Sequence, residues 1–110
     1  MRRPKIDIPK KDIEEFCKKN HIDALALFGS VLSDQFNSES DIDFLVQFER
    51  DHKPSLFGIV RMEEELKVLF QRDIDLKTPF EISKFFREEV IKEAYPIYGS
   101  KRFQSHRSYS

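Results

Sequence analysis

Residues 41–48 read Asp-Ile-Asp-Phe-Leu-Val-Gln-Phe and have the clearest strand pattern in this chain of 110 residues. Every second residue is apolar, so we expect one apolar face, made by Ile42, Phe44, Val46 and Phe48. The opposite face begins with two carboxylates, Asp41 and Asp43. Because acidic side chains are seldom buried without a partner, this strand predicts a site that binds cations.

A second apolar run precedes this strand and ends in a Gly-Ser pair. Residues 23–28 predict a short buried strand, Gly29 supplies the turn that ends it, and residues 30–36 predict one or two helical turns. A strand that turns sharply into a helix N-terminus exposes backbone N–H groups, which bind phosphate oxygens. Gly29 and Ser30 are therefore candidate phosphate-binding residues.

A third strand is predicted over residues 73–77 and carries another carboxylate, Asp75. Two aspartates at i and i+2 of a strand lie on one face, roughly 7 Å apart. They can reach a pair of ions about 3.5 to 4 Å apart, as in two-metal phosphoryl-transfer sites. Asp73 shares the face of Asp75, but Asp75 lies deeper in the strand and is the preferred third ligand. Oxygen ligands of this kind select Mg²⁺ first and Mn²⁺ second.

The remaining segments predict helices. Residues 10–21 and 56–72 have apolar side chains at helical spacing, and residues 80–98 suit one helix or two short ones, with Phe85 and Phe86 in the core. The expected fold is a small α/β (α+β) domain with a mixed sheet of three or four strands and helices packed on one face. We expect this domain over residues 1–98, followed by a flexible basic tail over residues 99–110.

Composition narrows the functional classes. The net charge is −1, so we expect no direct binding of nucleic acid. No apolar run approaches the roughly 20 residues of a membrane span, and the N-terminus lacks a secretory signal, so we expect a cytoplasmic protein with no membrane partner. The lone Cys17 predicts ordinary packing, and the three histidines, His21, His52 and His106, lack metal-ligand spacing and are expected at the surface.

The motifs together resemble a known family. Gly29-Ser30, then ten residues, then Asp41-x-Asp43, and later Ile74-Asp75-Leu76, are similar to the minimal nucleotidyltransferases of the DNA polymerase β-like superfamily. Within that superfamily the chain resembles the MntA-type antitoxins that pair with HEPN-domain ribonuclease toxins. The resemblance covers about residues 10 to 98.

The resemblance implies a polymerase β-like fold and a set of roles. Asp41 and Asp43 would hold two Mg²⁺ ions, with Mn²⁺ as a substitute; Asp75 would be the third ligand and the base; Gly29 and Ser30 would hold the phosphates of ATP. The implied reaction is transfer of AMP from ATP to a protein hydroxyl, that of a tyrosine in the HEPN toxin. The implied partner is that toxin, in a hetero-oligomer with this chain.

One part of the motif departs from the family. Many relatives continue the Gly-Ser corner with a small residue and an arginine, whereas Val31-Leu32-Ser33 follows here. A cation that could contact the triphosphate is thus missing from the turn, and Lys77 or Arg61 would have to replace it. The departure keeps a second hypothesis open, in which the antitoxin neutralises its toxin by direct binding and its nucleotide site is weak or vestigial.

Overall fold

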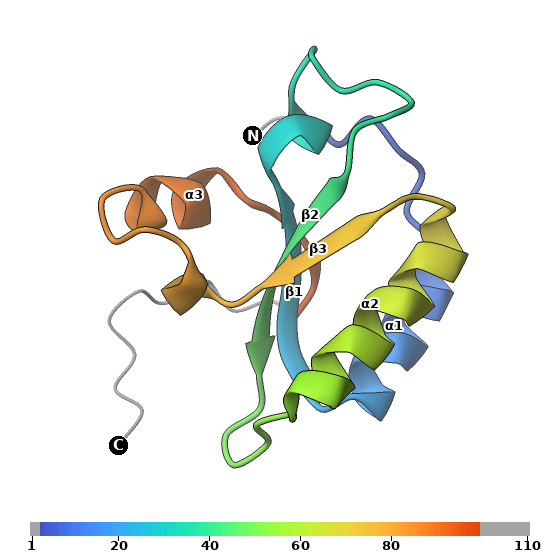
Figure 1. Ribbon diagram of the computed structural model, residues 1–110, viewed down its shortest axis with the longest axis vertical. Helices are drawn as coiled ribbons and strands as arrows, with labels where there is room; N and C mark the ends of the chain where they lie inside the picture. Colours follow the sequence, from blue (N-terminus) through green and yellow to red (C-terminus); the bar gives the residue numbers. More distant parts are fainter. Residues whose placement is uncertain (1–2, 100–110) are drawn as a thin grey trace.

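The chain folds as a four-stranded mixed sheet with three helices, which the computed structural model describes for residues 3–99 (Figure 1). The strands are β1 (Ile22–Phe28), β2 (Ile42–Phe48), β3 (Ile74–Lys77) and β4 (Tyr95–Tyr98), in the order β3-β2-β1-β4. The helices are α1 (Lys10–Lys19), α2 (Leu56–Phe70) and α3 (Arg87–Glu93), with 3₁₀ turns η1 (Gly29–Leu32) and η2 (Pro79–Glu81). β2 and β3 are parallel, and the other pairs are antiparallel.

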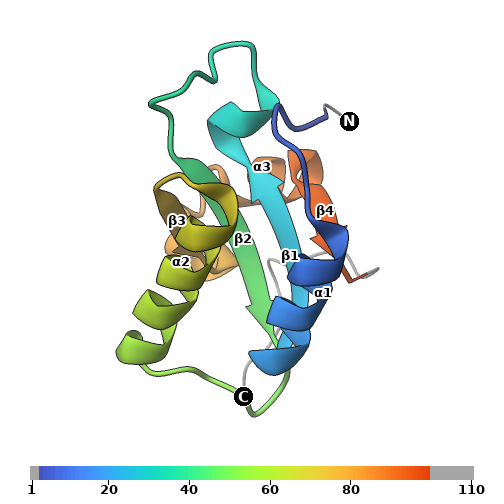
Figure 2. The same ribbon diagram turned by 90° about the vertical axis from the view of Figure 1, so that its right-hand side faces the viewer.

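The two faces of the sheet carry different side chains, as the alternation in β2 predicts. Leu25, Leu27 and Phe44 are fully buried in the main core, against α1 and α2. Ala26 and Leu45 lie in a smaller cluster with residues of α3. Figure 2 shows α1 and α2 in front of the sheet and α3 behind it. The expected fold class is confirmed, but only α1 and α2 share one face, because the small side chains of β1 leave room for α3 on the other.

Local interactions fix the ends and the position of α2. The Ser55 hydroxyl accepts a hydrogen bond from the Gly58 backbone N–H at 3.1 Å, which is a regular N-cap. The Glu63 carboxylate of this helix accepts a hydrogen bond from the Leu76 backbone N–H at 3.1 Å. Helix α2 therefore covers the outer edge of β3, which would otherwise present a free backbone donor.

Two expectations for the C-terminal part are wrong. Residues 95–98 were predicted to be helical but form β4. Pro96 follows Tyr95, and a proline disfavours helical backbone at the residue before it. Phe85 and Phe86 were expected in the core, but 81% and 59% of their surfaces are exposed.

The expected tail over residues 99–110 lies outside the described residues except for Gly99. Within residues 3–99, no helix combines the length and apolarity needed to cross a membrane.

Cys17 offers a test of the main core. Its side chain is fully buried, and this burial raises the pKa of the thiol to about 12. Because the thiolate is the reactive form, we expect native protein to resist a disulfide exchange reagent and urea-unfolded protein to react completely. A Cys17→Ser, Gln35→Cys variant, with its thiol at an exposed position, should react in the native state. Equal reaction rates for native and unfolded wild-type chain would contradict the described core.

Candidate functional site

Gly29 brings the backbone at the end of β1 against the carboxylate of Asp43. Its φ is +76°, in the left-handed region that side chains rarely adopt. A Cβ atom at this position would lie 2.5 Å from Asp43 Oδ2 and 3.3 Å from its Cγ. The corner therefore requires glycine for two independent reasons, its backbone conformation and the close approach of Asp43.

The strand register collects the carboxylates beside this corner. Phe28, the last residue of β1, pairs with Asp43, and Asp43 pairs in turn with Asp75 on the parallel strand β3. In Figure 1 the cyan turn η1 follows β1 and lies beside the start of β2. Asp41 is exposed one residue before β2 begins. The structure thus places the predicted acidic residues and the Gly-Ser corner at one end of the same three strands.

The carboxylates form a patch of like charge that Lys77 partly offsets. Burial raises the pKa of Asp43, the negative charges of Asp75 and Asp41 raise it further, and Lys77 opposes this effect. The Lys77 ammonium lies 3.3 Å from Asp75 Oδ2. Asp43, on the middle one of the three strands, is therefore a residue for which a negative charge is costly.

The donor set suits a hard divalent cation. Asp41, Asp43 and Asp75 offer only carboxylate oxygens, and a bound cation would relieve their mutual repulsion. Among residues 3–99, the one group of three whose ligand atoms all lie within 4.8 Å of one another is elsewhere, so these carboxylates are not a closed cage. Mg²⁺ is commonly held by one or two carboxylates together with substrate phosphates. The residues present therefore fit Mg²⁺ when a phosphate substrate completes its ligands.

The turn after Ser30 provides no positive charge. Val31 is fully buried and Leu32 is 7% exposed, because both side chains pack into the main core. Of the two substitutes considered from the sequence, Lys77 lies beside the carboxylates. Arg61 is exposed on α2, the helix that covers the opposite face of the sheet. Lys77 is therefore the better placed cation for a triphosphate.

Arg72 is a contributor that sequence reasoning missed. One guanidinium nitrogen donates to the carbonyls of Asn37 and Ser40, at 2.8 and 2.9 Å, and the group stacks 4.3 Å from the centre of the Phe36 ring. Arg72 thus holds the loop that leads into Asp41. In the sequence it is simply the basic residue after a helix, and nothing in the pattern indicates contacts more than 30 residues away.

The chain belongs to the nucleotidyltransferase domain family, whose pattern it matches over residues 10–98. One similar protein is the protein adenylyltransferase MntA of Thermococcus cleftensis, 29% identical over 84 residues that cover 76% of this chain and 80% of that protein. Together with the site, these matches define the chain as a minimal nucleotidyltransferase.

Two solved structures share the fold. One is a toxin–antitoxin complex with AMP-PNP, similar at a TM-score of 0.68 and 19% identity over 86% of this chain and 76% of that one. The other contains a tri-AMPylated HEPN toxin of Shewanella oneidensis with its MNT antitoxin, at a TM-score of 0.59 and 19% identity over 83% of this chain and 70% of that one.

Replacing Gly29 with alanine tests the corner. We expect Gly29→Ala to lower the free energy of unfolding by about 1 to 3 kcal/mol, because of the left-handed φ, and more if the Asp43 carboxylate cannot move aside. In an Asp43→Ala background the carboxylate is absent, so the same glycine substitution should cost less. Urea unfolding of the four proteins measures both quantities. Equal costs in the two backgrounds would contradict the close approach of Gly29 and Asp43.

The raised pKa of Asp43 predicts a pH-dependent stability. A carboxyl whose pKa is raised by folding favours the folded state at low pH and loses that contribution as the pH rises through its raised pKa. Asp43→Asn should therefore be more stable than wild type at pH 7 in chelator-treated buffer, and the difference should shrink toward about pH 3. Asp73→Asn, an exposed position ion-paired with Lys67, is the control and should show no such gain. A less stable Asp43→Asn protein at pH 7 would contradict this prediction.

Proposed function

We propose that this chain transfers AMP from ATP to a tyrosine hydroxyl of a HEPN-domain toxin and so acts as its antitoxin in the cytoplasm. The observation that carries the proposal is the register of three strands, which sets Asp43 between Asp75 and the Gly29 corner. Such an arrangement combines a phosphate-binding turn with ligands for a hard cation.

The related proteins support the partner and the transferred group. One relative is named as a protein adenylyltransferase, and two structures of the same fold are toxin–antitoxin complexes, one with AMP-PNP and one with an AMPylated HEPN toxin. For this chain we therefore propose ATP as the nucleotide and a HEPN-domain protein as the acceptor, in a hetero-oligomer.

The proposed roles follow from position. Gly29 and Ser30 bind phosphate oxygens at the corner, and Asp41, Asp43 and Asp75 hold two Mg²⁺ ions. When bound, these ions supply positive charge that offsets the charge of the triphosphate. The acceptor oxygen forms a bond to the α phosphorus, the bond from that phosphorus to the bridging oxygen of the β phosphate breaks, and pyrophosphate leaves. Asp75 is the proposed base that takes the hydroxyl proton.

Lys77 is the proposed substitute for the arginine that is missing after the corner. It is two residues beyond Asp75 on the same face of β3, and its ammonium already lies beside that carboxylate. From this position it can approach an anionic phosphate while leaving the ligands of the metal in place. Its flexible stem suits a point contact rather than the bidentate contact of an arginine.

The experiment is a transfer assay with ATP labelled at the α phosphate, Mg²⁺ and a HEPN-domain toxin as the acceptor protein. We expect labelled toxin with wild type, and a loss on the order of 10²-fold or more with Asp43→Asn, because a ligand for the charge of the transition state is removed. Asp73→Asn is the matched control and should retain transfer. Removal of Mg²⁺ with a chelator should stop it. No label on the toxin with folded wild type would overturn the proposal.

A second function, neutralisation by binding alone, is favoured by the turn after Ser30. Val31 and Leu32 are core residues, so this turn adds no cation to the site. A toxin that remains inhibited by Asp43→Asn protein, without transferred label, would support the binding function. Inhibition that disappears with the label would support transfer.

A further inference from the structure

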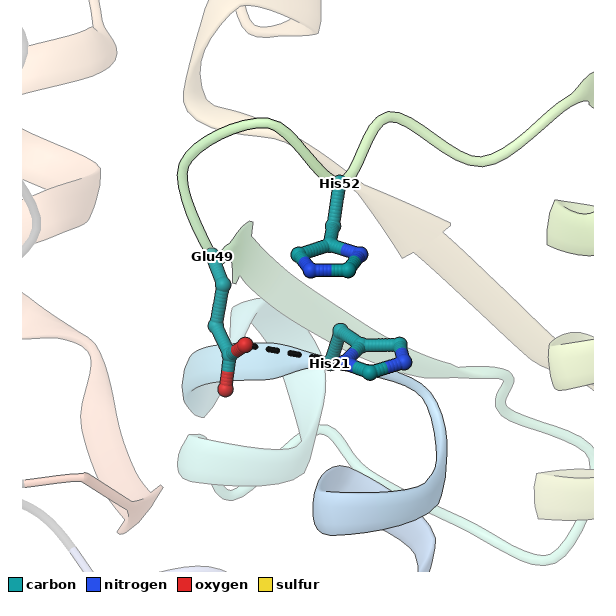
Figure 3. A group of neighbouring side chains, drawn as sticks. All are labelled: His21, Glu49 and His52. Atoms are coloured by element: carbon teal, nitrogen blue, oxygen red, sulfur yellow. Dashed lines mark ion pairs between the residues drawn. The ribbon is translucent and has the colours of Figure 1, made fainter.

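Three side chains with metal-binding chemistry meet at the opposite end of β1 and β2 from the carboxylate site. His21, Glu49 and His52 are all exposed, and their ligand atoms lie within 4.8 Å of one another. Figure 3 shows the His52 ring above the His21 ring, with the Glu49 carboxylate directed toward His21. His21 Nδ1 lies 3.6 Å from Glu49 Oε1. The two imidazole rings are stacked, with centroids 3.9 Å apart and 6° between their planes.

The backbone holds this group together independently of the side chains. The Glu49 N–H donates to the His21 carbonyl at 2.8 Å, and the His52 N–H donates to the Glu49 carbonyl at 3.0 Å. A contact between two chain segments joins His21 to Glu49, and a turn joins Glu49 to His52, so the backbones of all three residues are linked. This preformed backbone reduces the ordering that a bound ion would have to impose, and the exposed imidazole rings must then rotate out of their stack so that one nitrogen of each faces the ion.

A shift in the strand register creates the pairing. The β1–β2 ladder has an irregularity between Ile22 and Ala24. In the register of residues 24–28, His21 would lie opposite Arg50. The shift places it opposite Glu49 instead, as their backbone hydrogen bond shows. The bulge thus places the Glu49 carboxylate, rather than the Arg50 side chain, opposite His21.

We propose that His21, Glu49 and His52 form a binding site for a divalent transition-metal ion, with Zn²⁺ as the ion of choice. Two imidazole nitrogens and one carboxylate oxygen form a ligand set typical of Zn²⁺, and the exposure of all three leaves a fourth position to water. Imidazole is a poor ligand for Mg²⁺, so this site would discriminate against the ion expected at Asp43. The ion would join the turn between α1 and β1 to the connection between β2 and α2.

The two sites are separate. His21 immediately precedes the seven residues of β1, and Gly29 immediately follows them. A strand of that length spans roughly 23 Å. Zinc binding can therefore be measured whether or not the chain transfers nucleotides, and the failure of one proposal leaves the other intact.

The test is a Zn²⁺ titration of the full chain, free of any polyhistidine tag, against a chromophoric chelator in the presence of excess Mg²⁺. At pH 7.5 we expect one tightly bound Zn²⁺ per chain. His52→Ala, Glu49→Gln and His21→Asn should each weaken binding by at least about tenfold, since each removes a ligand. Asparagine is chosen at position 21 because the φ there is +55°, which asparagine tolerates. Circular dichroism verifies that each variant is folded.

His106→Ala is the matched control, because it removes an imidazole that is not part of the described group. It should bind Zn²⁺ as wild type does, and at the same Zn²⁺ concentration the melting temperature of both proteins should rise more than that of His52→Ala. The proposal is overturned if the wild type competes for no Zn²⁺, if the variants at positions 21, 49 and 52 bind as wild type does, or if His106→Ala loses binding equally.

Discussion

The contact between the Gly29 backbone and the Asp43 carboxylate is the constraint on which the site depends. Since Phe28 is paired with Asp43, the first residue beyond β1 must pass directly over the Asp43 side chain. A Cβ atom there would force the Asp43 carboxylate to move, and the left-handed φ of Gly29 turns the chain into η1. Val31 and Leu32 then enter the core, which anchors the corner in place. The Gly-Ser corner and the Asp43 carboxylate, which are the proposed phosphate-binding turn and metal ligand, are thereby held in place by ordinary packing.

The two faces of the sheet differ: one carries the main core, and the other carries the proposed site. The large apolar side chains of β1 and β2, such as Leu27 and Phe44, pack against α1 and α2 on one face. The other face has a small apolar cluster around Leu45, and the carboxylates occupy its end. The raised pKa of Asp43 shows that this end disfavours its own charge. A cation bound there would remove this repulsion, which favours the proposed metal site.

The sequence predicted what depends on local pattern and missed what depends on distant contacts. Alternation in residues 41–48 predicted β2 and its two faces, and the place of Asp43 opposite Asp75 agrees with the expected meeting of two strands. The sequence could not indicate that Arg72 holds the loop before Asp41, because that contact joins residues more than 30 positions apart. Phe85 was predicted to lie in the core only because it is apolar, and in the fold its side chain is exposed.

The same antiparallel pair explains how the two proposed ligand sets occur in so small a chain. At one end, Phe28 opposite Asp43 brings the corner to carboxylate oxygens. At the other end, the ladder shift at Asp23 brings His21 to Glu49. Asp23 itself accepts a hydrogen bond from the buried Gln47 at 3.1 Å, which anchors the bulge to β2. Hard oxygen ligands and imidazole ligands prefer different ions, so the geometry of one strand pair is sufficient to keep the two proposed metal sites apart.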